Sequence, residues 1–292
     1  MIDVCVCTYQ RPASLQRTLQ SLAKQRWSEG MRVIVADNDF TPSAKAVVDA
    51  SRPASPHEIV YLHAPAQNIS IARNACLAAS SETLLAFIDD DEEASPDWLS
   101  TLYDHLLSHR LDVVFGPVQA IYQPGTLAWI AEGDFLSTRP WIPRSGRIDT
   151  GYAGNVLLRR AVCGATRFNP DFGRTGGEDT LFFAALHSGG ARLGYCATAE
   201  VTHHVPAKDT TLRSLMRRRF RAGQGSWRAL RDRGEGPLQI LAMAIARVAY
   251  CCLQGLLALP SPVGWRRYAI STAFHAGVVA RSLGIRADAI YG

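Results

Sequence analysis

Three neighbouring carboxylates, Asp89, Asp90 and Asp91, directly follow a short apolar run in this chain. Adjacent carboxylates repel one another and raise one another's pKa unless a cation neutralises them. Oxygen ligands suit Mg²⁺ or Mn²⁺, which typically bind one or two carboxylates together with substrate phosphates. The cluster therefore predicts a divalent-cation site. The alternative is a solvated acidic turn that continues through Glu92 and Glu93.

A second acidic pair, Glu178 and Asp179, follows two glycines at the expected start of a helix. A carboxylate there can act as a general base toward a hydroxyl group. The alternative is an ordinary acidic first turn, which the helix dipole favours.

Two adjacent histidines, His203 and His204, end a strand-like run. One of them can complete the coordination of a metal ion that is already held by carboxylates. Side chains alternate along a strand, so only one of the two faces such a site. We favour His203 and keep His204 as the alternative.

The elements that must position these groups follow an α/β pattern. Apolar runs at 4–8, 32–36, 58–62, 83–88 and 112–115 predict strands, and helical patterns begin at Pro12, Ile69 and Ser95. This alternation favours a mostly parallel sheet covered by helices on both faces, with ligands beyond the carboxyl ends of the strands. Thr8, Tyr9, Asp37 and the three acids at 89–91 all fall at those ends.

Later segments are less regular. Residues 116–150 lack clear periodicity and contain four prolines, which indicates an irregular segment lining a site. Runs at 151–160 and 193–202 predict further strands, and 178–186 predicts a helix. Two phosphate-binding motifs, GxxxxGK[ST] and a GxGxxG after the first strand, are absent from the sequence. A bound diphosphate would then depend on a metal ion and on basic side chains.

The charge is unevenly distributed. Residues 206–292 hold 14 Lys and Arg against 4 Asp and Glu, a net charge of +10, whereas the remainder carries −5. The basic run from Arg217 to Arg221 lacks the interleaved aromatic residues of a base-stacking surface, so we expect no nucleic-acid partner. A lipid diphosphate or an anionic membrane surface fits better, and a solvated helix face is the alternative.

The run at 240–259 is apolar except for Arg247 and Gln254 and has the length of a membrane span. An arginine near the middle would cost about 2.5–3.5 kcal/mol on insertion scales. A spanning helix, an interfacial helix and a buried helix therefore all stay open. With a second apolar stretch at 268–283, the run predicts a membrane-docking appendage.

The seven cysteines form no CxxC pair, and the first residues show no signal-peptide pattern. We therefore expect reduced thiols in a cytoplasmic protein that is peripherally associated with the inner membrane.

Together these features resemble the family 2 glycosyltransferases, which have the GT-A fold. The resemblance covers residues 2–225. It rests on the runs at 4–12, 35–38, 87–91 and 96–99, on Asn68 with Ala72-Arg73-Asn74, on Gly154-Asn155, on Gly177-Glu178-Asp179 and on His203-His204. The opening of the chain also resembles glucosyltransferases of succinoglycan-type exopolysaccharide assembly.

The resemblance implies a Rossmann-like GT-A catalytic domain at 1–225, with a nucleotide-binding half at 1–115 and an acceptor-binding half at 116–225. A basic and hydrophobic helical region follows at 226–292. The implied reaction is an inverting, Mn²⁺- or Mg²⁺-dependent transfer of a hexose, with glucose favoured, from a UDP-sugar. The implied acceptor is a hydroxyl of a polyprenyl-diphosphate-linked oligosaccharide, and the implied pathway is exopolysaccharide biosynthesis.

The resemblance also implies a role for each matched residue. The donor-binding set is Thr8, Tyr9 and Arg11 around the nucleotide, Asp37 on the uracil ring, Arg73 near the base or phosphate, and Asp89 and Asp90 on ribose and sugar. The metal ligands are Asp91, Asp89 and His203 or His204. Asp179 is the catalytic base, and Glu178 assists acceptor binding. The family often has a small residue where Asp90 stands, so which two of the three acids reach the metal stays open.

Two other functions compete with this one. A metal-dependent nucleotidyltransferase or nucleotide-sugar phosphohydrolase would use the same acids on the same nucleotide. A non-catalytic membrane-surface binding module would need neither Asp91 nor Asp179.

Overall fold

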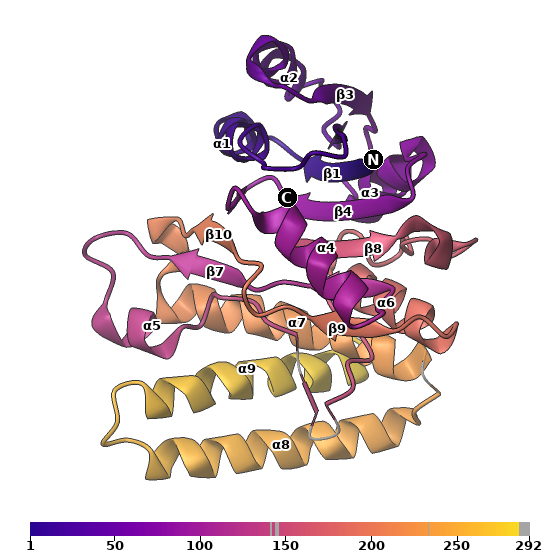
Figure 1. The fold of residues 1–292 in the computed structure, drawn as a ribbon. Coiled ribbons are helices and arrows are strands. Elements are labelled where there is room, and N and C mark those ends of the chain that lie inside the picture. Colours follow the sequence, from indigo (N-terminus) through magenta and orange to yellow (C-terminus); the bar gives the residue numbers. More distant parts are fainter. Residues whose placement is uncertain (141, 144–145, 233, 286–292) are drawn as a thin grey trace. The chain divides into compact units, whose positions relative to one another are not determined.

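The chain forms two compact units in the computed structural model, which describes residues 1–140, 142–143, 146–232 and 234–285 (Figure 1). The first, here called the sheet unit, comprises Met1–Ala120, Ser137–Gly173 and Glu178–His204. The second, the helical unit, comprises Ile121–Leu136, Arg174–Gly177 and Val205–Gly292. The predicted functional boundary at residue 225 stays a prediction.

A seven-stranded sheet forms the centre of the sheet unit, with strand order β3-β2-β1-β4-β8-β6-β9. The strands are β1 (Ile2–Thr8), β2 (Met31–Asp37), β3 (Glu58–His63), β4 (Leu84–Asp89), β6 (Val113–Phe115), β8 (Asn155–Arg159) and β9 (Leu193–Tyr195). All neighbours pair in parallel except β8, which is antiparallel to both β4 and β6. The predicted α/β class with a mostly parallel sheet is confirmed.

The predicted single strand at 193–202 is wrong in one respect, because the chain turns at Cys196 and forms two strands. The first is β9, and the second is β10 (Val201–His204) in a separate three-stranded sheet of order β5-β10-β7. Its other members are β5 (Glu92–Ala94) and β7 (Val118–Ile121). The segment 116–150, predicted to be irregular, thus contributes the short strand β7 and the helix α5 (Ala128–Gly133).

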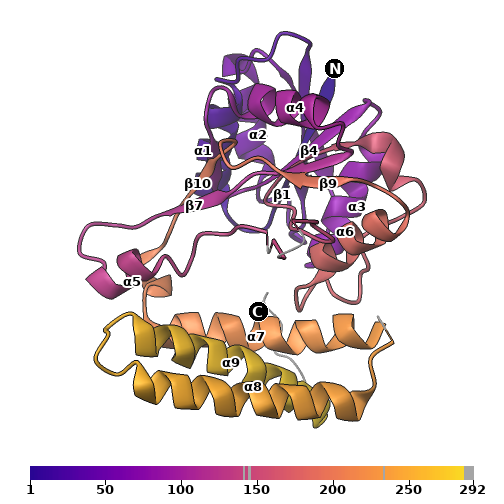
Figure 2. The ribbon, with the colours of Figure 1, turned by 60° about the horizontal axis from the view of Figure 1, so that its bottom comes forward.

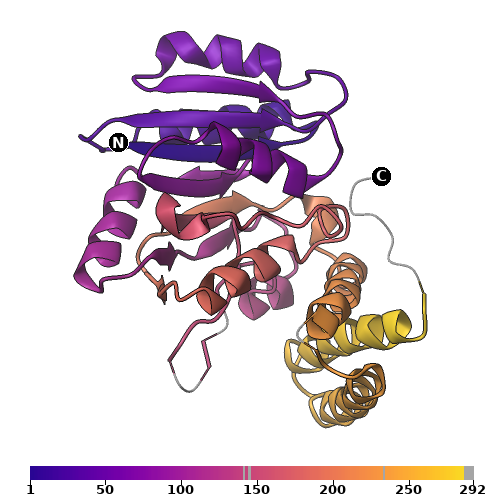
Figure 3. The same ribbon diagram turned by 90° about the vertical axis from the view of Figure 1, so that its right-hand side faces the viewer.

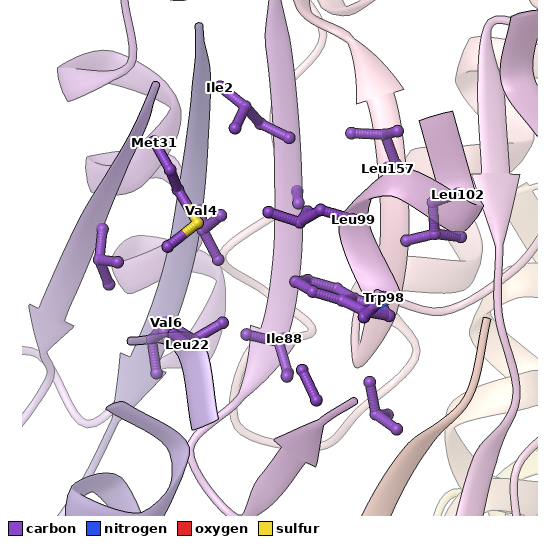
Figure 4. Close-up of a cluster of buried hydrophobic side chains, with 14 of the residues drawn as sticks. Ile2, Val4, Val6, Leu22, Met31, Ile88, Trp98, Leu99, Leu102 and Leu157 are labelled. Atoms are coloured by element: carbon purple, nitrogen blue, oxygen red, sulfur yellow. The ribbon is translucent and has the colours of Figure 1, made fainter. Parts of the chain in front are cut away.

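Side-chain alternation along the strands divides the core between the two faces of the large sheet. Ile2, Val4 and Val6 of β1 pack on one face with residues of α1 (Pro12–Leu22) and α4 (Trp98–Ser108), as the close-up in Figure 4 shows. Cys5 and Cys7 pack on the opposite face with α3 (Ile69–Ala79) and α6 (Glu178–Ser188). Both faces are therefore covered, which explains why the strands read as continuous apolar runs.

The helices begin near their predicted positions. The Asn68 side chain caps α3 by accepting hydrogen bonds from the backbone N–H groups of Ser70 and Ile71, at 3.1 and 3.4 Å. Helix α4 begins at Trp98, three residues after the predicted Ser95 cap. The remaining short helices are α2 (Lys45–Ser51), η1 (Arg52–Ala54), η2 (Arg160–Cys163) and η3 (Ala207–Asp209).

The helical unit contains three long helices, α7 (Leu212–Asp232), α8 (Pro237–Leu257) and α9 (Gly264–Ser282), which lie side by side (Figures 2 and 3). Helices α7 and α9 approach closely at two glycines, Gly223 and Gly277. A Cβ on Gly223 would lie 1.9 Å from the backbone oxygen of Phe274, and a Cβ on Gly277 would lie 2.0 Å from that of Phe220, so only glycine fits at these positions. Among the described residues, α8 is the one helix long and apolar enough to cross a membrane.

Only a narrow stripe of side chains along helix α8 is buried against the rest of the helical unit. Ile240, Ala244 and Cys251 are buried, and the first two join Val278 of α9 in a small core. The remaining surface of α8 is mostly apolar and exposed, although Gln239 and Arg247 are exposed there as well. Its large apolar members are Leu238, Met243, Ile245, Tyr250, Leu253, Leu256 and Leu257. All seven cysteines of the chain are free thiols, and Cys252 on this surface is exposed.

Candidate active site

The strand register brings the predicted site residues to one edge of the large sheet. Thr8 at the end of β1 is level with Asp37 at the end of β2, and Cys7 is level with Asp89 at the end of β4. Three parallel strands therefore deliver their terminal polar residues to the same rim, as the sequence predicts.

Asp90 is the most enclosed of the three neighbouring acids, with a side chain that is 6% exposed. It accepts a hydrogen bond from the Thr8 hydroxyl at 2.7 Å, and Arg11 Nη1 lies 3.2 Å from its other oxygen. Burial raises the pKa of Asp90 to about 7, although the Arg11 cation acts in the opposite direction. Asp90 is thus a buried carboxyl group for which the nearby Arg11 cation only partly offsets the effect of burial.

Asp91 lies beside two basic side chains. Arg11 Nη1 is 2.6 Å from its Oδ2, and His203 Nδ1 is 3.6 Å from its Oδ1. Burial acts to raise the pKa of Asp91, but His203 and Arg11 outweigh it and lower the pKa. His204 lies elsewhere, with Nε2 3.3 Å from Glu93 Oε1. The structure therefore brings His203, and not His204, to the carboxylate cluster.

Glu92 is a buried carboxyl group below Asp89 that the sequence reasoning missed. Its Oε2 accepts the backbone N–H of Asp89 at 3.0 Å. Burial, together with Asp89 and Asp91, raises the pKa of Glu92 well above its usual value. A Cβ on Gly154 would lie 2.8 Å from Glu92 Oε1, so this glycine leaves room for the acids. The run of five acids at 89–93 is the available signal, but the sequence-based prediction names its fourth member only in the alternative of a solvated acidic turn.

The first turn of α6 presents the second acidic pair. Asp179 is partly exposed, and its Oδ1 accepts the backbone N–H of Thr180 at 2.7 Å. Glu178 is buried and lies against Arg73, which also approaches Asp89. The side chain of Arg73 therefore lies between the acids of the strand end and those of α6.

Asp37 is completely buried, and both of its carboxylate oxygens accept hydrogen bonds from the protein. Its Oδ1 accepts the backbone N–H of Asp39, and its Oδ2 accepts the backbone N–H of Ala44 and the Tyr61 hydroxyl, at distances of 2.8–3.1 Å. These bonds hold the loop after β2. An ionised carboxylate has about four acceptor positions, so these three bonds leave room for one more, and the predicted uracil contact of Asp37 stays a prediction.

Several matched residues support the rim instead of lining it. Asn155 accepts the indole N–H of Trp98 and donates to the carbonyl oxygens of Pro117 and Ala199, at 2.8–2.9 Å. Asn74 holds the backbone of Phe168 by donating to its carbonyl oxygen and accepting its N–H.

The fold matches those of solved glycosyltransferases. The mannosyltransferase PcManGT from Pyrobaculum calidifontis, solved with GDP-Man and Mn²⁺, aligns with a TM-score of 0.67 at 16% identity, over 97% of this chain and 86% of that one. S. aureus TarS 1–349, solved with UDP-GlcNAc, aligns with a TM-score of 0.57 at 16% identity, over 97% and 92% of the two chains. The fold is therefore of the GT-A-like class, with C-terminal helices of which one is long and apolar.

The sequence comparisons give the family. The family model described as "Glycosyl transferase family 2" matches residues 3–167. The succinoglycan biosynthesis protein ExoM of Rhizobium meliloti (strain 1021) is 42% identical over 297 aligned positions, which cover 100% of this chain and 96% of the relative. The chain belongs to glycosyltransferase family 2 and is a glycosyltransferase, EC 2.4. The predicted family is confirmed.

Proposed function

We propose that this enzyme transfers a hexose, with glucose the first candidate, from a UDP-sugar to a hydroxyl of a lipid-linked oligosaccharide in exopolysaccharide biosynthesis, with inversion at the anomeric carbon. The observation that carries the proposal is the arrangement of acids in the sheet unit. Asp91 lies beside His203 at the strand ends, and Asp179 follows Glu178, the Arg73 partner, in the first turn of α6. The full-length similarity to a succinoglycan biosynthesis protein supports the pathway, and the UDP-GlcNAc bound by TarS supports a UDP-sugar.

Asp91 and His203 fit a divalent cation. Among the described residues, three or more His, Cys, Asp or Glu side chains do not gather into a complete metal site. Mg²⁺ and Mn²⁺ do not need one, because they usually bind one or two carboxylates and take further oxygen ligands from phosphates and water. Asp91 would hold the ion with His203, and Asp89 is the third candidate ligand. The Mn²⁺ in PcManGT supports this choice of metal.

When bound, such an ion would neutralise charge on the diphosphate of the donor. The protein supplies the other charge-stabilising groups. Arg11 lies against Asp90 and Asp91, Thr8 ends β1, and Tyr9 follows it. We assign these residues to the nucleotide pocket. Asp89, with a side chain that is 43% exposed, can accept hydrogen bonds from ribose or sugar hydroxyls.

Asp179 is assigned as the catalytic base and Glu178 as its helper on the acceptor side. Asp179 removes the proton from the acceptor hydroxyl while that oxygen forms a bond to the anomeric carbon. The bond from that carbon to the diphosphate oxygen breaks at the same time, and UDP leaves with the electron pair. A single displacement of this kind inverts the anomeric centre.

The test is a donor screen that measures both direct binding and nucleoside diphosphate release. UDP-glucose, UDP-galactose, UDP-N-acetylglucosamine, GDP-mannose and dTDP-rhamnose are compared with Mn²⁺, Mg²⁺ or EDTA. Selective binding of a UDP-sugar that EDTA abolishes supports the proposal. Binding that ignores the metal contradicts the carboxylate assignment. Product analysis separates the rivals: phosphate chemistry without sugar transfer indicates a phosphohydrolase or nucleotidyltransferase, and activity that survives Asp91→Ala and Asp179→Ala would contradict both assignments.

We further propose that the helical unit lies on an anionic membrane surface, which places the enzyme at the cytoplasmic face of the inner membrane. The exposed apolar side of α8 supports this, and so do the basic residues of α7. At the turn between α8 and α9, Arg266 lies 4.4 Å from the Trp265 ring and 4.8 Å from the Trp129 ring. Tryptophan and arginine beside an apolar helix are typical of a membrane interface.

Vesicle sedimentation tests this surface. Leu253→Glu combined with Leu257→Glu should weaken binding to anionic vesicles by at least about tenfold, because each leucine loses about 1.5 kcal/mol or more of apolar burial. Leu107→Glu, at an exposed position of α4, is the matched control and should change nothing. Equal binding by the double variant and the control would exclude α8 as the docking helix.

A further inference from the structure

Arg73 is a buried cation that touches two groups of acids. It lies in α3 and is 6% exposed. Its Nη1 is 2.5 Å from Glu178 Oε1, and its Nη2 is 3.5 Å from Asp89 Oδ1. One guanidinium group therefore joins the end of β4 to the first residue of α6.

An aromatic stack holds the guanidinium group in place. Its central carbon lies 5.5 Å from the centre of the Phe168 ring. Phe168 stacks on Phe182 of α6 at 4.0 Å and meets Phe87 of β4 edge to face at 5.7 Å. Two of the three rings, Phe87 and Phe182, thus come from the same two elements that supply the acids, and Phe168 lies in the loop that precedes α6. Little freedom remains for Arg73 to swing toward a ligand.

The electrostatics match a fixed ion pair. Burial acts to lower the pKa of Arg73, but Glu178, Asp89 and Asp179 outweigh it and raise the pKa, so the cation persists. Glu178 contacts Arg73 through Oε1. Its other carboxylate oxygen, Oε2, is buried and has no hydrogen-bond partner among the described residues. A buried pair with an unsatisfied oxygen is a poor source of stability. Its presence beside Asp179 points to a role in the reaction.

We propose that Arg73 is a positioning residue that fixes the first turn of α6, and therefore Asp179, relative to Asp89. This inference rests on the proposed function of Asp179 as the base. Glu178 and Asp179 are consecutive residues at the start of α6, so holding the first restricts the second. The role differs from the nucleotide contact that the family resemblance implies for Arg73. It predicts that Arg73 affects the chemical step and leaves donor binding unchanged.

Steady-state kinetics and UDP binding of Arg73→Met and Arg73→Lys test the proposal. Displacing a catalytic group by about 1 Å can cost about 100-fold in rate, so Arg73→Met should lower kcat by about that factor. The donor KM and the Kd for UDP should stay within about twofold. Arg73→Lys keeps a cation and should recover part of kcat. Arg26→Met, at an exposed arginine of the sheet unit, is the control and should behave as wild type.

Urea unfolding shows whether each variant is folded, and rates are expressed per folded enzyme. If Arg73→Met does not fold, Arg73→Lys carries the test: it keeps the cation but loses the two-armed contact with both acids, and it should lower kcat about tenfold at unchanged Kd. A raised Kd with normal kcat would overturn the proposal in favour of a nucleotide contact. A kcat per folded enzyme equal to that of wild type would overturn it as well. Absence of transfer by the wild-type enzyme would instead overturn the proposed function.

Discussion

Buried carboxylates occur at both edges of the large sheet, but the two edges differ in how far hydrogen bonds and cations compensate for burial. At the amino edge, Asp3 of β1 is fully buried and receives five hydrogen bonds: two from Arg32, one from the Ser80 hydroxyl and two from the backbone N–H groups of Ser81 and Glu82. Burial acts to raise the pKa of Asp3, but these partners outweigh it and lower the pKa.

At the carboxyl edge the balance is reversed. Asp90, Glu92 and Glu178 are buried acids whose pKa is raised mainly by burial; acidic neighbours add to the rise, and Arg11 at Asp90 and Arg73 at Glu178 oppose it. Asp91 is the exception through His203 and Arg11. One edge therefore satisfies its carboxylate within the protein, whereas the other gathers more negative charge than its own cations neutralise. Such an excess is expected where a metal ion and a substrate complete the site.

The largest expected effect is on the reaction itself. Asp179→Asn removes the proposed base and should lower kcat by about 10²–10⁴-fold, the usual contribution of general-base catalysis. The Kd for UDP should not change, because Asp179 lies on α6 and not at the strand ends. Asp104→Asn, an exposed acid of α4, is the control. Transfer that continues at the wild-type rate would remove Asp179 from the mechanism.

Next in size is the effect on metal-dependent binding. Asp91→Asn should weaken UDP binding in Mn²⁺ by about 100-fold, since even groups that only orient metal ligands are typically worth 10–100-fold. Isothermal titration calorimetry gives the affinity with Mn²⁺ and with EDTA. Asp3→Asn should bind normally wherever it is folded. An Asp91→Asn variant with wild-type affinity would show that the two edges do not differ in the way described.

Asp3→Asn should act on stability alone. It leaves Arg32 without its carboxylate and should lower the free energy of unfolding by roughly 2 kcal/mol, the scale of hydrogen bonds to a charged group. Because the native pKa of Asp3 is lowered, its contribution is present above the unfolded pKa of about 3.9 and is lost as the pH falls through the native value. Urea unfolding at pH 7 and at pH 3 should show the gap between wild type and variant narrowing at pH 3. A gap that is independent of pH would contradict the assignment.

The smallest effect is expected for Glu92→Gln. The raised pKa of Glu92 favours its neutral form, and a glutamine oxygen can still accept the N–H of Asp89. Its free energy of unfolding should therefore stay within about 0.5 kcal/mol of wild type, or rise as repulsion is relieved. A loss as large as that of Asp3→Asn would mean that Glu92 is an ion-paired structural acid.

The sequence predicts most of the elements because their signals are local. Continuous apolar runs mark β1 to β4, and α3 begins where its pattern predicts. The short strands β5 and β7 escape prediction because three or four residues carry no period. The division of 193–202 escapes it because β9 pairs with β6 and β10 pairs with β5, partners that are distant in the sequence.

The candidate site divides in the same way. Polar clusters after apolar strands predict Thr8 and the acids at 89–91. What a side chain touches across long sequence separations cannot be read from such patterns. The hydrogen bonds of Asp37 with Ala44 and Tyr61, and the contact of Arg73 with Glu178, depend on the completed packing.

The central claim is that the carboxyl edge is completed by a metal ion and a nucleotide diphosphate together. Differential scanning calorimetry of the wild-type enzyme with Mn²⁺, with UDP in EDTA, and with both ligands tests it directly. We predict that the rise in Tm with both ligands exceeds the sum of the two separate rises, because each ligand then completes the binding site of the other. For scale, a ligand at 100 times its Kd contributes about 2.7 kcal/mol to the free energy of unfolding. An equal rise with UDP in EDTA would contradict the claim, because the acids would then play no part in holding the nucleotide.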